Sequence, residues 1–195
     1  MTLVTPIARE DLADMEPMFQ MVEASMGFVP SSMLTMAHWP ELLQAFGALG
    51  GTVLSGGEVD PGLKQLVAFV VSNAAGCRYC QAHTSHSAER RGVSLEKIRA
   101  AFEFETSDLF DDAERAALRV ALHAGMVPNA VEPAHMDALR VHFTDKQCVE
   151  IVGVISLFGY LNRWNDTMAT TLEDSPKSFA SGELGSKGWE AGKHG

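Results

Sequence analysis

Apolar residues along this chain recur at steps of three and four positions, and runs that alternate apolar with polar residues are nearly absent. Steps of three and four bring side chains to one face of an α-helix, whereas alternation is typical of β-strands. The pattern therefore predicts an all-α fold. The expected helices cover residues 8–26, 33–36, 40–49, 60–76, 77–92, a short stretch from 94, 111–125 and a long stretch from 144.

Polar residues with capping character stand at the start of several of these helices. Asp60 precedes a proline, and a proline at the first helical position loses no hydrogen bond. Asp111 with Glu114, and Thr144 with Gln147, have the spacing of capping boxes. The helix after Thr144 is apolar on nearly every side, which predicts a central position or a place at a subunit interface.

The length of 195 residues suits a single domain. We expect residues 1–172 to form one all-α domain with its core at about 40–125. Residues 173–195 form a tail rich in glycine, serine and lysine, a composition typical of disorder. Trp189 and His194 in this tail nevertheless predict that it docks, for instance on a neighbouring subunit, with mobility as the alternative.

Acidic residues outnumber basic ones by 25 to 15, which gives the chain a net charge of −10. Such a surface repels phosphate groups, so nucleic acids and anionic membranes are excluded as expected partners. No apolar run approaches the roughly 20 residues that cross a bilayer, and the first residues lack the features of a signal peptide. The expected location is the cytoplasm, where a CxxC motif indicates redox chemistry or metal binding.

The candidate chemistry lies in a series of four residues spaced by three: Cys77, Cys80, His83 and His86. Neighbours in this series come within reach on a helix, but the four positions turn through half a circle and cannot all point at one atom. This geometry favours a redox dithiol over a zinc site, and we also rank two inert cysteines lower. A c-type haem site is excluded because Gln81 follows the motif, so no metal, haem or nucleotide cofactor is expected.

The two cysteines are expected to differ in role because of their places on the helix. The unpaired N–H groups at a helix N-terminus favour a thiolate at Cys77, and Arg78 adds to this effect. The first cysteine of such a motif is usually the exposed one, so Cys80 is expected to be the more buried partner. His83 follows one turn later, where it can act as the base for Cys80, with His86 as a second candidate.

A polar segment at residues 162–166 interrupts the apolar helix near the end of the domain. Asn162 and Asp166 share one helical face, and Arg163 can meet Asp166. We interpret the segment as a structural polar network, with a wall of the CxxC pocket as the alternative.

Three stretches of the chain, MGFVPSSMLTMAHWPELL, LKQLVAFVVSNAAGCRYCQAHT and LFGYLNRWND, together resemble the carboxymuconolactone decarboxylase superfamily, including its alkyl hydroperoxide reductase D-like branch. The resemblance covers roughly residues 25–172. It implies an all-α helical bundle, homo-oligomers that are often trimers or hexamers, and a peroxidase that uses both cysteines. The decarboxylase branch acts on a lactone without this pair, so the CxxC motif favours the redox branch.

The sequence departs from the relay that the resemblance implies, which is a glutamate twelve residues before the first cysteine and a histidine four residues after the second. Gln65 and Thr84 stand at these two positions. A helix shifted by one residue would let His83 take the place of the relay histidine.

The expected function is that of a thiol-dependent peroxidase or disulfide reductase acting on a small hydroperoxide. Cys80 would attack the terminal peroxide oxygen, Cys77 would resolve the sulfenic acid as a disulfide, and another thiol system would reduce that disulfide. The alternatives are a non-redox carboxymuconolactone decarboxylase-type enzyme, and an oligomeric binding protein with reduced catalysis.

Overall fold

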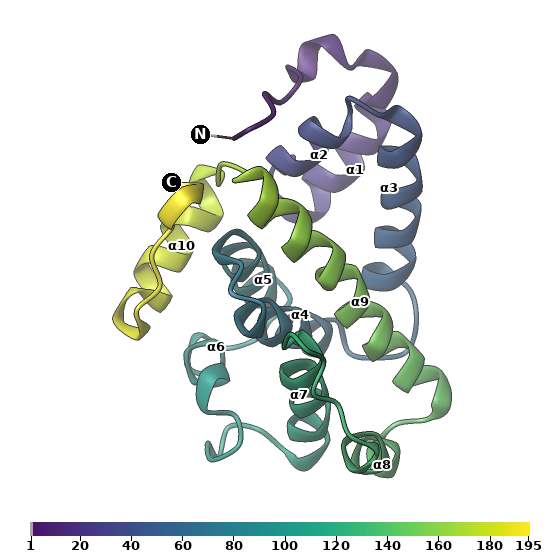
Figure 1. Cartoon of the computed structure of the whole chain (residues 1–195), viewed down its shortest axis with the longest axis vertical. Coiled ribbons are helices and arrows are strands. Elements are labelled where there is room, and N and C mark those ends of the chain that lie inside the picture. The colour runs from purple at the N-terminus through teal and green to yellow at the C-terminus, as the bar shows by residue number, and fades with distance from the viewer. Residues whose placement is uncertain (1) are drawn as a thin grey trace.

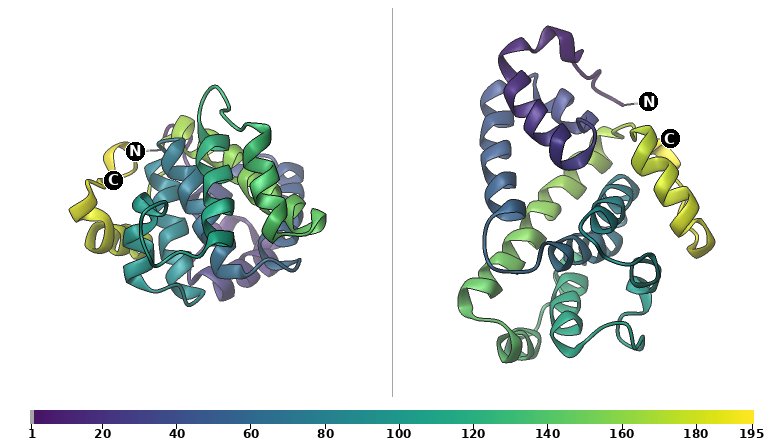
Figure 2. Two further views of the ribbon diagram at one scale, coloured as in Figure 1. Left: turned by 90° about the horizontal axis from the view of Figure 1, so that it is seen from below. Right: turned by 180° about the vertical axis from the view of Figure 1, so that it is seen from behind.

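Every regular element in residues 2–195, the part of the chain that the computed structural model describes, is helical (Figures 1 and 2). The all-α prediction is therefore confirmed. The α-helices of this range are α1 (Glu16–Met26), α2 (Ser31–Met36), α3 (Pro40–Ser55), α4 (Pro61–Ala74), α5 (Arg78–Arg90), α6 (Leu95–Ala100), α7 (Asp112–Gly125), α8 (Pro133–His142), α9 (Asp145–Met168) and α10 (Asp174–Leu184).

Helix α4 lies at the centre of the fold, where it packs against α5, α7 and α9. Its residues 62–72 are all buried, since neighbouring helices cover it on every side. Helix α9 crosses the molecule diagonally in Figure 1 and connects the α8 end to the C-terminal segment. Its predicted central position holds for one face, which carries Ile151 and Val154, whereas Val149 on another face is 71% exposed.

The capping signals in the sequence mark the starts of their helices correctly. The Asp60 carboxylate accepts a hydrogen bond from a backbone N–H in the first turn of α4. Asp111 with Glu114 opens α7 as a complete capping box, and Thr144 with Gln147 opens α9 in the same way. These contacts satisfy backbone donors that no helix can satisfy internally.

Replacement of Asp60 with alanine is expected to lower the free energy of unfolding by about 1 kcal/mol, because the first turn of the central helix loses its cap. Urea unfolding monitored by circular dichroism measures this change. Asp137→Ala is the matched control, since that side chain is 75% exposed and pairs only with Arg140 on the surface. An equal decrease in the free energy of unfolding in the two variants would contradict the assignment of Asp60 as the N-cap.

One expectation about a helix boundary is wrong. Helix α3 does not end at Leu49 but continues through Gly50 and Gly51 to Ser55. A helical glycine costs only about 1 kcal/mol relative to alanine, and packing of α3 against α4 and α9 outweighs that cost. The helix ends before Gly57, whose φ of +88° lies in the left-handed region. Helix α8, for which the sequence pattern gave no expectation, packs against α7 and α9.

The N-terminal helices α1, α2 and α3 form a smaller apolar cluster beside the main core (Figure 1). Its buried members include Phe19, Met33, Met36 and Leu43. Leu161 and Trp164 of α9 pack against this cluster, so α9 joins it to the rest of the molecule. No helix in residues 2–195 has the length and apolar character needed to span a membrane.

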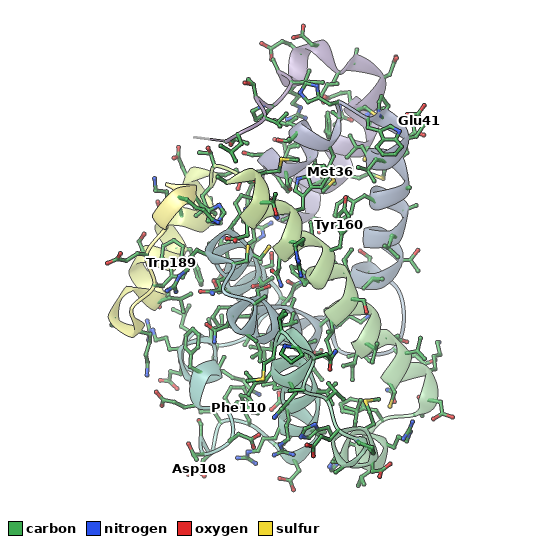
Figure 3. The ribbon with its side chains drawn as sticks, viewed as in Figure 1. Met36, Glu41, Asp108, Phe110, Tyr160 and Trp189 are labelled. Atoms are coloured by element: carbon green, nitrogen blue, oxygen red, sulfur yellow. The ribbon has the colours of Figure 1, made fainter. Side chains whose placement is uncertain are left out.

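The C-terminal segment 173–195 is helical and folds back against α5 of its own chain (Figure 1). Trp189, labelled in Figure 3, is buried, and its indole N–H donates to the backbone oxygen of Arg78 at 3.3 Å. His194 is also buried, and its backbone oxygen accepts from the N–H of Leu172 at 2.9 Å. The segment thus brings side chains from the end of the chain to the helix that carries the CxxC motif.

Candidate active site

The CxxC motif lies at the N-terminus of α5. Gly76 turns the chain with a φ of +77°, and Cys77 is the N-cap, whose sulfur accepts a hydrogen bond from the backbone N–H of Cys80 at 3.5 Å. Both thiols are free and buried, with 0% exposure at Cys77 and 2% at Cys80. The expectation of an exposed Cys77 is therefore wrong, and the reason is that the C-terminal segment lies over the start of α5.

The two sulfurs have opposite acidities. A hydrogen bond from the Cys80 side chain lowers the pKa of Cys77 despite burial, and backbone N–H groups act in the same direction. Burial raises the pKa of Cys80 well above its usual value, and the neighbouring Cys77 raises it further. Asn165 of α9 opposes this, because its amide N–H donates to the Cys80 sulfur at 3.5 Å. Cys77 is therefore the more acidic of the two thiols.

His83 is held by a carboxylate that arrives from the C-terminal segment. Its Nε2 lies 2.6 Å from Oε2 of Glu173. The other oxygen of Glu173 accepts from the hydroxyl of Tyr79 at 2.9 Å and from the backbone N–H of Ser31, the first residue of α2. The Tyr79 ring stacks on the imidazole with centroids 4.2 Å apart. These contacts fix both the position of the imidazole and the nitrogen that faces the acid.

Glu173 is ionised although it is largely buried. Burial alone would raise the pKa of its carboxyl, but the charge and hydrogen bond of His83, together with backbone hydrogen bonds including that of Ser31, lower it to about 2. An ionised carboxylate can only accept a hydrogen bond, so Nε2 of His83 carries a proton towards it. The pair is thus suited to deliver and recover a proton.

The stability of the protein should fall in acid because of Glu173. The folded-state pKa of about 2 lies below the ordinary value of 4.5, so the stabilisation is complete above pH 4.5 and is lost as the pH falls towards 2. The shift corresponds to about 3 kcal/mol. Urea unfolding of parent and Glu173→Gln at pH 6 and pH 3 measures it. The difference between the two proteins should shrink at pH 3, and an unchanged difference would contradict the assignment.

Thr84 and Gln65, which stand where the resemblance implies a relay histidine and glutamate, make other contacts in this structure. Thr84 donates its hydroxyl to the backbone oxygen of Cys80 at 2.7 Å, so it is occupied within α5. Gln65 is buried on α4. His86, named with His83 from the sequence, lies 3.4 Å from the hydroxyl of Ser175 and stacks near Phe28. The structure brings Cys77, Cys80 and His83 together and turns His86 away to the side of α10.

A cavity of about 340 Å³ opens beside Cys80. Cys80 and His83 line it, whereas Cys77 lies behind and does not. Gln65, Thr84 and Asn165 add polar groups to the same lining. Most of the wall is apolar and comes from α1, α2, α3 and α9, with contributions from Met18, Met21, Val22, Met26, Met33, Phe46, Leu54, Phe158 and Leu161. The site accommodates a small apolar molecule in contact with one sulfur of the pair.

On the other side of Cys77 a second group of chemically active side chains comes together. The sulfur of Cys77, a carboxylate oxygen of Asp166 and a ring nitrogen of His194 all lie within 4.8 Å of one another. Asp166 belongs to the last turns of α9, and His194 to the short helical turn Gly192–His194. Thus both cysteines face a histidine with an acid, one pair on each side of the dithiol.

Sequence reasoning found the cysteines and His83 but missed Glu173 and Asn165 as their partners. Glu173 lies 90 residues from His83, in a segment whose composition is typical of disorder. Asn165 lies within the segment 162–166, whose alternative interpretation as a pocket wall agrees with its contact to Cys80. Contacts between residues so far apart in the sequence leave no local pattern. The only sequence signal for these partners was therefore the density of polar groups in 162–166.

The chain matches the model of the carboxymuconolactone decarboxylase family over residues 40–123. Helices α4 and α5, which carry Gln65 and the CxxC motif, fall within this match. The chain is 31% identical over 110 residues to the uncharacterized protein YnjA of Escherichia coli (strain K12), a match that covers 56% of this chain and 60% of YnjA. The matched region thus spans less than two thirds of that relative.

Solved structures extend the similarity to nearly the whole chain. The debrominase Bmp8, as its C82A variant in complex with 2,3,4-tribromopyrrole, is 38% identical with a TM-score of 0.88, covering 93% of this chain and 97% of Bmp8. An uncharacterized peroxidase-related protein from Ralstonia eutropha JMP134, with an alkylhydroperoxidase AhpD core, is 26% identical with a TM-score of 0.74, covering 84% and 87%. This chain belongs to the carboxymuconolactone decarboxylase superfamily, in its AhpD-like branch.

Proposed function

We propose that this protein is a dithiol-dependent reductase that removes a halogen from a small halogenated aromatic molecule. The observation that carries the proposal is that Cys80 alone of the dithiol lines an apolar cavity, with Cys77 one turn away to complete a disulfide. The similarity to the debrominase Bmp8 over nearly the full length of both chains supports the choice of substrate class. Methionine and aromatic side chains in the cavity suit a flat, polarisable ring.

The reaction consumes two thiols and replaces one carbon–halogen bond with a carbon–hydrogen bond. As Cys80 attacks the bromine, its thiol proton moves to Cys77, and a sulfur–bromine bond forms while the carbon–bromine bond breaks. The electron pair of the broken bond stays on the ring carbon, which takes a proton. Cys77 then passes its proton to the group that protonated the ring carbon and attacks the Cys80 sulfur, so that the sulfur–bromine bond breaks, a disulfide forms and bromide leaves. An external thiol system reduces the disulfide to restart the cycle.

His83 is the proposed donor of the proton that the ring carbon takes. It lines the cavity beside Cys80, and Glu173 holds it through Nε2. The ionised Glu173 can only accept a hydrogen bond, so Nε2 of His83 carries a proton that the ring can give up. Asn165 stabilises the developing thiolate of Cys80 through its amide N–H.

Bromide release tests the proposal directly. The reduced protein is mixed without oxygen with polybrominated pyrroles, including 2,3,4-tribromopyrrole, and bromide and free thiols are both counted. We expect one bromide for every two thiols lost in a single turnover. Cys148→Ser serves as control, because Cys148 lies in α9 away from the cavity and should not change the result. Intact thiols and no bromide would overturn the proposal.

Reduction of an organic hydroperoxide is the second candidate, favoured by the similarity to the peroxidase-related protein from Ralstonia eutropha. The same two sulfurs would act, with the terminal peroxide oxygen in place of bromine and a sulfenic acid in place of the sulfenyl bromide. The apolar cavity predicts that cumene hydroperoxide reacts faster than hydrogen peroxide. Rates of thiol loss with cumene hydroperoxide and with a brominated pyrrole, measured on one preparation, decide between the candidates.

A further inference from the structure

The cluster behind the dithiol has the geometry of a metal site. Cys77, Asp166 and His194 present a sulfur, an oxygen and a nitrogen within 4.8 Å of one another. The Nε2 atom of His194 lies 3.6 Å from Oδ1 of Asp166. Ligand atoms around a tetrahedral zinc ion lie about 3.3–3.6 Å apart, so the longest edge of this triangle needs to contract by only about an ångström.

The imidazole of His194 is held in the form that binds a metal. Its Nδ1 lies 2.8 Å from the backbone oxygen of Thr170, and because a carbonyl can only accept, Nδ1 carries the proton. Nε2 then presents a lone pair towards the cluster. This atom is buried and has no hydrogen-bond partner within residues 2–195, on a side chain that is 1% exposed. A buried acceptor without a partner is costly, and a metal ion would satisfy it.

The other two ligands complete a set with one soft, one intermediate and one hard donor. The sulfur of Cys77 is the soft donor, and it lies at the start of α5, where it accepts a hydrogen bond from the backbone N–H of Cys80 at 3.5 Å. The second oxygen of Asp166 pairs with Lys193 at 2.9 Å, which leaves the first oxygen directed at His194. Thiolate and imidazole together select zinc over magnesium or calcium.

We propose that the reduced protein binds one Zn²⁺ ion through Cys77, Asp166 and His194, with water at the fourth position, and that the bound ion blocks oxidation of the dithiol. Binding exchanges the proton of the Cys77 thiol for the metal. The disulfide form has no thiolate at this position and therefore does not bind the ion. The site is open only in the reduced state.

One ligand of the site is accessible to solvent outside the substrate cavity. The Asp166 side chain is 46% exposed and borders a second cavity of about 440 Å³, which neither cysteine lines. Asp166 is therefore open to solvent on a face separate from the cavity that Cys80 lines. The inhibitory part of the inference rests on the proposed dithiol reductase function, whereas the binding site itself does not.

Zinc binding is measured on metal-free, fully reduced protein without oxygen, by competition with a chromophoric zinc chelator. We expect one equivalent per chain, at least tenfold weaker binding in His194→Gln and in Asp166→Asn, and none in the disulfide form. His142→Gln is the matched control, because this histidine ends α8 far along the chain from the cluster and should bind as the parent does. Binding below a tenth of an equivalent, or unchanged affinity in His194→Gln, overturns the proposal.

Cobalt substitution tests the site in the parent protein and so does not depend on folding of the variants. Tetrahedral Co²⁺ with one thiolate ligand should give an intense sulfur-to-metal absorption in the near ultraviolet, and its absence would count against the site. For inhibition, one equivalent of Zn²⁺ should slow thiol loss to substrate at least tenfold, and a chelator should restore the rate. Thiol loss without zinc tests the reductase function separately, so the two proposals fail independently.

Discussion

Replacement of Cys80 with serine is expected to lower the rate of substrate reduction by at least about a thousandfold, under either candidate reaction. The reason is positional, since Cys80 is the sulfur that lines the cavity while Cys77 lies behind it. A serine hydroxyl at this position is too weakly acidic and too poor a nucleophile to attack bromine or peroxide oxygen. The measurement is the initial rate of bromide release or hydroperoxide loss with excess reductant.

Cys77→Ser should behave differently and so identifies the order of attack. Cys80 remains in contact with the cavity in this variant, so one substrate molecule should react, and turnover should then stop because no second thiol can release the halide or water. A sulfenyl species trapped on Cys80 would be visible by mass spectrometry. If Cys77→Ser lost the first reaction while Cys80→Ser kept it, the roles of the two sulfurs would be reversed.

The elements around the dithiol were accessible from the sequence because their signals are local. The N-cap at Asp60, the capping box at Thr144 and the start of α5 at the CxxC motif all depend on residues within one helical turn. The same reasoning failed for α3, where a pair of glycines is a local signal for an end but long-range packing against α9 keeps the helix intact. Local rules succeed where tertiary packing agrees with them.

The polar partners of the site were not accessible in this way. His83 is separated from Glu173 by 90 residues, and His194 is separated from Cys77 by 117, with the C-terminal segment supplying one member of each pair. The composition of the C-terminal segment predicted disorder because Gly, Ser and Lys dominate it. In the structure, however, Trp189 and His194 of this segment are buried, and Trp189 contacts α5. Two buried aromatic side chains thus outweigh the average character of the segment.

Loss of the carboxylate at Glu173 should lower the rate of catalysis strongly, although less than loss of Cys80. In Glu173→Gln the amide oxygen would stay towards Ser31 and Tyr79, which are both donors, and the NH₂ group would face His83. Because the NH₂ group can only donate, Nε2 of His83 must then be unprotonated, and the ring loses the Nε2 proton that it gives up in the parent. We expect the rate to fall about a hundredfold.

Glu183→Gln is the matched control for this experiment, since Glu183 also belongs to the C-terminal segment and forms an ion pair with Arg99 on α6. It should retain nearly the full rate. A merely structural role for Glu173 would lower the rate only in proportion to the fraction of protein that is unfolded, which circular dichroism measures on the same samples. A role in proton delivery lowers the rate of fully folded protein, so a rate that only follows the folded fraction in Glu173→Gln would refute the assignment of His83 and Glu173 as the proton-donating pair.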